Sequence, residues 1–179
     1  HYPDVMKTVI RPLIYAITMS VYISSEKSEE QFMEKIASNL RPLGFKCLYN
    51  LFNQLGDVLD WSPYISDIFN NVISPRLEKF EDENLQQPSS VMKIITYWAE
   101  QKPLYNFLYY NELSAVVALM KTLKNSNAKE SVIGVILNFC NKIINAPDKD
   151  PRYVELIILV VTTSLQQLPY ILQKCTDHN

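Results

Sequence analysis

The stretch PSSVMKIITYW, residues 88–98, indicates most clearly which kind of fold this chain adopts. A proline opens it, as is common in the first helical turn, where the N–H that proline lacks would have no partner. The apolar residues that follow have the i, i+3, i+4, i+7 spacing of a helix with one core-facing stripe: Val91, Ile94, Ile95 and Trp98. The stretch therefore predicts a helix that packs against a core.

Similar start signals and apolar periods recur along the chain. They place helix starts near Pro3, Glu29, Pro63, Pro88, Glu112, Ala128 and Pro151. Short loops between successive helices favour antiparallel neighbours. With only 3 glycines in 179 residues, few positions suit hairpin turns or phosphate-binding loops. The sequence predicts an all-α fold of antiparallel helix pairs.

Several details of these helices are predicted from local patterns. Apolar residues four apart mark the expected inner face of the first helix: Val5, Val9, Leu13, Ile17 and Val21. In the second helix, Ser28 with Gln31 forms a capping box, and the inward face continues along three further residues: Phe32, Ile36 and Leu40. Asn127 with Glu130 is a second capping pair, and the polar residues 81–87 predict a loop between repeat units.

The run Leu156–Val161 is open to two interpretations. It is rich in β-branched residues and resembles a buried strand. However, Asp150-Pro151 forms a helix start before it, and leucines at 165, 168 and 172 extend a helical period after it. The helix is the preferred interpretation.

Composition places the chain among ordinary globular proteins. It is 47% hydrophobic and 20% charged, with a net charge of −2, so its surface as a whole does not indicate nucleic-acid binding. The three cysteines, Cys47, Cys140 and Cys175, have no pairing or metal-binding spacing and predict buried thiols in a reducing compartment. No uninterrupted apolar run reaches the roughly 18 residues of a membrane span, so no membrane partner is expected.

Small residues and prolines suggest how the helices are arranged. Leu40-Arg41-x-x-Gly44-x-x-Cys47 puts small residues on one face of the second helix of a pair, and Pro12 and Pro75 interrupt the first helices of two pairs. These features favour a HEAT-like α-solenoid segment over a closed bundle. Because the chain begins at His1, we expect residues 1–179 to be one helical-repeat segment of a much longer solenoid.

No catalytic pattern is evident in the sequence. The histidines are His1 and His178, at the two ends, and no nucleophile elbow, Walker loop or zinc spacing occurs. The densest acidic group is Glu26, Glu29, Glu30 and Glu34; it suits a helix start better than a catalytic pair. We therefore expect no enzyme activity, metal, cofactor or small-molecule substrate.

The candidate contact residues are lysines. Lys121, Lys124 and Lys129 flank the turn 125–127 and could present a basic edge to phosphates or to an acidic partner. A solvated helix end explains the same residues. Six aromatic residues could stack on bases, although core packing is the simpler interpretation: Trp61, Trp98, Tyr105, Phe107, Tyr109 and Tyr110.

Three segments resemble a known family: RPLGFKCL at 41–48, VISPRLEK at 72–79 and QPSSVMKIITYW at 87–98. In this order they resemble the down-regulated-in-metastasis (DRIM) family of very large helical-repeat proteins associated with U-three snoRNA. The resemblance implies a nucleolar scaffold of the small-subunit processome that supports small-subunit rRNA processing. Its partners would be other ribosome-assembly proteins and pre-ribosomal RNA or a snoRNA-containing particle.

Two other functions remain open at this point. A karyopherin-like transport or adaptor solenoid would also have helix pairs and an acidic isoelectric point. An enzyme is supported only by the acidic group near residue 30.

Overall fold

The computed structural model describes residues 2–25 and 30–176, with side chains at 8–25 and 30–173. Throughout these residues the regular structure is helical, and no strand occurs in them, so the all-α prediction is confirmed. Residues 156–161 lie within a long helix, as preferred. The chain forms two compact units, His1–Arg76 and Leu77–Asn179.

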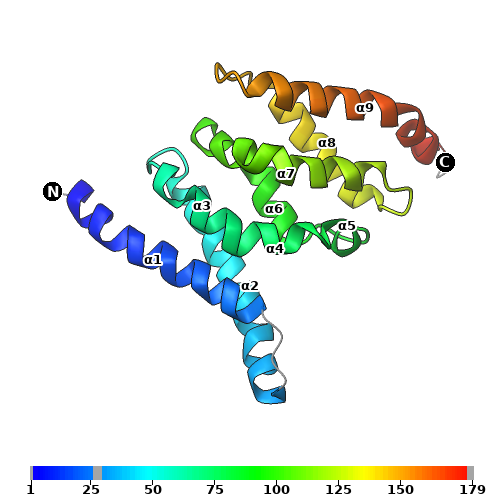
Figure 1. Cartoon of the computed structure of the whole chain (residues 1–179). Coiled ribbons are helices and arrows are strands. Elements are labelled where there is room, and N and C mark those ends of the chain that lie inside the picture. The colour runs from blue at the N-terminus through cyan, green and yellow to red at the C-terminus, as the bar shows by residue number, and fades with distance from the viewer. Residues whose placement is uncertain (1, 26–29, 177–179) are drawn as a thin grey trace. The chain divides into compact units, whose positions relative to one another are not determined.

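In the first unit, α1 (Tyr2–Ser25) packs against α2 (Gln31–Leu55), which crosses back over it (Figure 1). Both helices continue through an internal proline, Pro12 in α1 and Pro42 in α2. The Arg41 guanidinium donates hydrogen bonds to the Ser24 carbonyl, with Nε at 2.9 Å. A side chain of α2 thereby satisfies one of the carbonyls that the end of α1 leaves without an intrahelical partner.

At Gly44, α2 approaches α1 closely. A Cβ added to Gly44 would lie 2.5 Å from Cγ2 of Val21, a residue that is 1% exposed. The close approach expected of this small residue is therefore present.

The inner face of α1 differs from the predicted one. Val9 and Leu13 are exposed and Ile17 is half-buried, whereas Val21 is buried as predicted and the side chain of Val5 lies outside the described residues. Ile10 and Ile14 are buried although the prediction left them out. A strict four-residue repeat turns about 40° further round a 3.6-residue helix at each step, so five such positions spread over about 160°. The predicted set therefore could not form one stripe.

The first half of α2 has no core to face. Phe32, Ile36 and Leu40 are 71%, 43% and 38% exposed, so their predicted burial is wrong. Both figures show this half of α2 extending clear of α1. Ser28 of the predicted capping box lies outside the described residues, and Glu30 precedes the helix without a side-chain cap.

The first unit ends in η1 (Ser62–Tyr64), α3 (Ile65–Ile68), η2 (Phe69–Ile73) and α4 (Ser74–Leu77). Asp60 accepts a hydrogen bond from the Ser62 N–H at 3.0 Å, which lowers the Asp60 pKa. η2 is a π-helical segment that ends two residues before Pro75, which cannot donate the bond that a regular α-helix needs. The helix widens there instead of stopping.

The second unit begins with α5 (Phe80–Glu83) and α6 (Ser90–Tyr97). The predicted loop at residues 81–87 is only partly correct, because residues 81–83 belong to the short helix α5. Asn84, which is fully buried, explains this turn: its amide donates to the Phe80 carbonyl at 2.6 Å and accepts from the Ser89 N–H at 2.7 Å. Ser89 then caps α6 by accepting from the Met92 N–H.

The predicted stripe of α6 is confirmed. Its four residues are at most 2% exposed: Val91, Ile94, Ile95 and Trp98. The Trp98 ring stacks on Phe107, with centroids 4.8 Å apart.

The next elements are η3 (Lys102–Leu104) and α7 (Tyr105–Lys124). The predicted helix start near Glu112 corresponds to a real break, because the backbone of α7 is not helical at Tyr110–Leu113. Asn111, Glu112 and Leu113 have φ values of 49°, 53° and 60°. Left-handed conformations of residues with a Cβ cost roughly 1–2 kcal/mol each, so packing on both sides must hold this break.

Two long helices complete the second unit, α8 (Glu130–Asn145) and α9 (Tyr153–Thr176), and α9 packs on α7 and α8. The predicted capping pair is wrong: Lys129 precedes α8, and the Asn127 N–H donates to Asn125 Oδ1 instead. The predicted start of α9 is confirmed, since Asp150 Oδ1 accepts from the Arg152 N–H at 2.9 Å.

α9 also changes the expectation about membrane spans. By length and composition alone, Tyr153–Gln173 could cross a membrane, a test that core helices of soluble proteins also pass. Polar residues interrupt the apolar runs, so counting uninterrupted runs did not detect it.

We predict that Gly44→Ala destabilises the first unit. Overpacking against Val21 should cost about 1–3 kcal/mol, offset by about 1 kcal/mol of helix propensity. Urea unfolding followed by Trp61 fluorescence in a Trp98→Phe background measures the first unit. The matched control is Gly134→Ala in α8 of the second unit, where an added Cβ meets nothing within 4 Å; followed by Trp98 fluorescence in a Trp61→Phe background, it should stabilise that unit. Equal effects of the two changes would contradict the close approach.

Trp98→Ala should destabilise the second unit by about 3–5 kcal/mol, because a fully buried ring leaves a cavity beside Phe107. Urea unfolding followed by circular dichroism measures the loss. Trp98→Phe, which keeps an aromatic ring, should cost clearly less; a similar cost would mean that the stacked geometry is incorrect.

Candidate functional site

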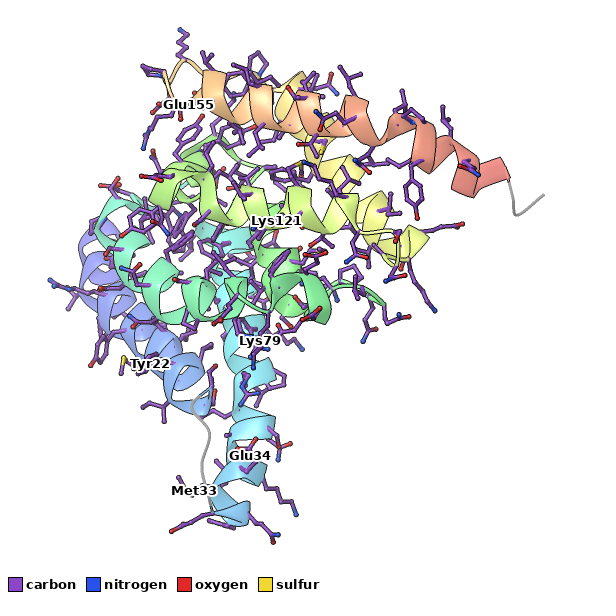
Figure 2. The ribbon with its side chains drawn as sticks, turned by 45° about the vertical axis from the view of Figure 1, so that its right-hand side comes forward. Tyr22, Met33, Glu34, Lys79, Lys121 and Glu155 are labelled. Atoms are coloured by element: carbon purple, nitrogen blue, oxygen red, sulfur yellow. The ribbon has the colours of Figure 1, made fainter. Side chains whose placement is uncertain are left out.

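The three candidate lysines are exposed and close in sequence to one turn. Lys121 and Lys124 lie in the last turn of α7, and Lys129 directly precedes α8. Figure 2 labels Lys121 on α7. We call the three residues and the turn 125–127 the lysine turn.

The backbone of the lysine turn is held by hydrogen bonds from other elements of the second unit. The Asn125 amide donates to the Glu81 carboxylate, and the Lys129 N–H donates to the Leu85 carbonyl at 2.9 Å. From α9, the Tyr170 hydroxyl donates to the Ser126 carbonyl at 2.8 Å. These contacts fix the turn as a firm platform for its lysines.

The three lysines differ in their surroundings. Lys121 lines a hollow of about 560 Å³ together with three acidic residues: Glu78, Glu81 and Glu112. The carboxylates reduce the positive potential at Lys121. Lys124 and Lys129 do not line this hollow, although one of its carboxylates, Glu81, also contacts the turn at Asn125.

The aromatic candidates for base stacking are mostly in the core. Trp61, Trp98, Tyr105, Phe107 and Tyr109 are all at most 6% exposed, and Tyr110 is partly buried. Trp61 packs on Phe52 and donates its indole N–H to the Leu55 carbonyl. Core packing therefore explains these residues.

A polar cluster joins the start of α7 to the residues before α9. The Tyr109 hydroxyl donates to Asp148 Oδ2 at 2.7 Å, and the Arg152 guanidinium lies 4.6 Å from the centre of the Tyr109 ring. Arg152 also donates to Asp150 and to Asn106 Oδ1, the latter at 3.0 Å. Sequence reasoning missed this cluster, because its partners are about 40 residues apart.

The pKa values in this cluster follow from the contacts. Hydrogen bonds from Arg152 lower the pKa of Asp150 to about 2, and in turn raise that of Arg152. Burial, with the nearby charge of Asp148, raises the pKa of Tyr105 to about 12 and also raises that of Tyr109. The tyrosines are hydrogen-bond donors within the fold, so we interpret the cluster as structural.

Residues that could hold a metal do not gather in the described part of the chain, where no group of three such side chains occurs. Glu30 and Glu34 are exposed, and Glu26 and Glu29 lie outside the described residues. Of the cysteines, Cys140 is buried as predicted, and its burial raises its pKa. Cys47 is exposed, so its predicted burial is wrong, and the side chain of Cys175 lies outside the described residues.

The first unit has a groove of about 820 Å³ beside α1, bounded on the other side by η1, α3 and η2. Arg11, Tyr15 and Asp67 are among its lining residues. Its charges are of both signs, and no single ligand chemistry follows from them.

Comparison with known proteins identifies the family. The sequence pattern described as "U3 small nucleolar RNA-associated protein 20, N-terminal" matches residues 1–179. The U3 small nucleolar RNA-associated protein 20 of Saccharomyces cerevisiae is 43% identical over 180 residues, covering 100% of this chain. The chain belongs to this family.

The Schizosaccharomyces pombe protein of the same name is 30% identical over 142 residues, 79% of this chain. The chain spans only 7% of the budding-yeast protein and 6% of the fission-yeast protein. The motifs at 41–48, 72–79 and 87–98 thus indicated the correct family, although they carry packing and not chemistry.

Alkaline pH should destabilise the second unit through Tyr105. The pKa of Tyr105 in the folded protein is about 12, above the ordinary value of 10.0. The stability that this shift gives the folded state is therefore present below pH 10 and is lost as the pH rises through 12. Tyr105→Phe should therefore reduce the loss of helical circular dichroism between these pH values. Tyr15→Phe, at an exposed tyrosine of α1, serves as the control; equal pH profiles for Tyr105→Phe and the unaltered chain would contradict the assignment.

Proposed function

We propose that this chain is a segment of a non-catalytic scaffold in ribosome biogenesis, part of the small-subunit processome, which supports processing of small-subunit rRNA in the nucleolus. The observation that carries the proposal is the family match over residues 1–179, together with relatives named for association with U3 small nucleolar RNA. An all-helical chain with large buried faces suits a scaffold.

The architecture in the proposal is a HEAT-like α-solenoid segment. The observations that support it are the pair α1–α2 with its close approach at Gly44, and the successive packing of α6, α7, α8 and α9. In a solenoid, each pair of helices buries its faces against the neighbouring pairs. Exposed apolar residues on outer helix faces are expected wherever a neighbouring pair is absent.

The test of this function uses the full-length protein. Cross-linking in cells followed by purification should recover U3 small nucleolar RNA, pre-ribosomal RNA and other ribosome-assembly proteins. Recovery of none of these would refute the proposal. Recovery of a transport GTPase and basic cargo in their place would support the transport-adaptor alternative.

Within this function, we assign RNA contact to the lysine turn, and above all to Lys124 and Lys129. Both are exposed, lie beside a turn that α5, the loop after α5 and α9 hold in place, and do not line the acidic hollow that Lys121 lines. Lysine ammonium groups bind phosphate oxygens and position an RNA backbone without reading its sequence.

Replacing both Lys124 and Lys129 by Gln should weaken RNA binding by the full-length protein. The logarithm of the binding constant falls as the logarithm of the salt concentration rises, and the double replacement should make this fall less steep by about 1.4, for two lost phosphate contacts with single-stranded RNA. Lys121→Gln should have a smaller effect, because three carboxylates share its hollow.

The matched control for charge is Lys93→Gln with Lys149→Gln, two exposed lysines of the same unit. An effect of the control pair equal to that of the Lys124 and Lys129 pair would show only an effect of net charge. Unchanged RNA binding with lost recovery of one assembly protein would assign the turn to a protein partner.

A further inference from the structure

The helix α9 has apolar stripes on two faces. The inner stripe, which includes Leu156 and Val160, is fully buried against the second unit. The outer stripe consists of large aliphatic side chains that are each about half exposed: Val154 (56%), Ile158 (58%), Leu165 (63%), Leu168 (47%) and Leu172 (57%).

The outer stripe has the geometry of a packing seam. With the partly buried Val161, its positions are separated by steps of 4, 3, 4, 3 and 4 residues, the alternation that keeps side chains on one line of a helix that packs on another. The stripe starts at Val154, two residues before Leu156 of the inner one. Two residues turn a helix by about 200°, so the two stripes lie on opposite sides of α9.

Charged side chains are absent from the outer stripe itself. Glu155, labelled in Figure 2, lies in the first turn of α9, Arg152 directly precedes the helix, and the polar residues between the stripes are uncharged from 162 to 167. A helix that lay permanently at the surface of a soluble unit would carry charges on its outer face. A contiguous exposed aliphatic stripe of this kind marks a contact surface.

We propose that the outer stripe of α9 is the packing surface for the next helix of the same protein, which follows residue 179 in the full-length chain. This helix runs antiparallel to α9. The proposal rests on the solenoid architecture in the proposed function. The chain spans 7% of the budding-yeast relative, so relatives of this family contain far more sequence than this segment.

The next helix is covalently linked to α9, and this link favours it over a second copy of the protein as the occupant of the stripe. A helix joined by a short loop is present at an effective concentration in the millimolar range, far above that of a separate molecule. A bilayer is disfavoured by the inner side of α9, where Leu156 is fully buried and the Tyr153 hydroxyl donates to the Ile143 carbonyl at 2.8 Å. Only one side of the helix remains for an occupant.

The test places a photo-cross-linking amino acid at Ile158, Leu165 or Leu172 of the full-length protein and maps the cross-linked peptides by mass spectrometry. We expect cross-links to the first helix after residue 179. Because that helix runs antiparallel, cross-links from Leu172 should fall nearest residue 179, and those from Ile158 further along the chain. The same amino acid at Gln166, exposed but off the stripe, should give few of these cross-links.

Cross-links from the stripe to another protein, to lipid, to a second copy or to a distant part of the chain would overturn the proposal. The reverse order of cross-linked positions would overturn the antiparallel arrangement. Recovery of U3 RNA by the unaltered protein is measured separately, so failure of this packing is distinguishable from failure of the proposed function.

A second measurement covers the case in which no cross-link forms. Leu165→Cys in the full-length protein should react with a maleimide at least about tenfold more slowly than Gln166→Cys, the factor given by an opening free energy of about 1.4 kcal/mol. Digestion and mass spectrometry separate these sites from the native cysteines. Equal reaction rates at the two positions would show that nothing covers the stripe.

Discussion

Burial of one helix face against the next is the constraint on which the described structure depends. Each long helix packs at least one apolar stripe on a neighbour. At one such contact, Trp98, which directly follows α6, stacks on Phe107 of α7. Where helices must approach most closely, a glycine occupies the contact, as Gly44 does beside Val21. Larger residues at such positions would push the helices apart and expose both stripes.

Polar groups in the second unit serve the same packing. Asn84 is fully buried and satisfies the backbone on both sides of a turn, and Tyr109 with Asp148 joins segments about 40 residues apart. A buried polar group is stable only when its hydrogen bonds are made, so these contacts fix the turns between helices. The hydrogen bonds of the lysine turn likewise give Lys124 and Lys129 a defined place on the surface.

Other large apolar residues of the described helices are exposed. Phe32 and Ile36 in α2 and Leu165 in α9 lie on helices whose other parts are well packed. Relatives that are many times longer than this chain provide further sequence that could cover such faces. In repeat proteins, a face without its neighbour is exposed because each repeat buries its surface only against the next one.

The sequence by itself determined the helical class, most helix starts and the inner face of α6, because proline, caps and a 3.6-residue period are local signals. Its three motifs also indicated the family. Only the tertiary structure decided which face of α1 is buried, that the first half of α2 has no core, and that residues 81–83 are helical. The reason is physical: on a helix with apolar residues on several faces, the partner helix selects the buried stripe, and no local pattern specifies that partner.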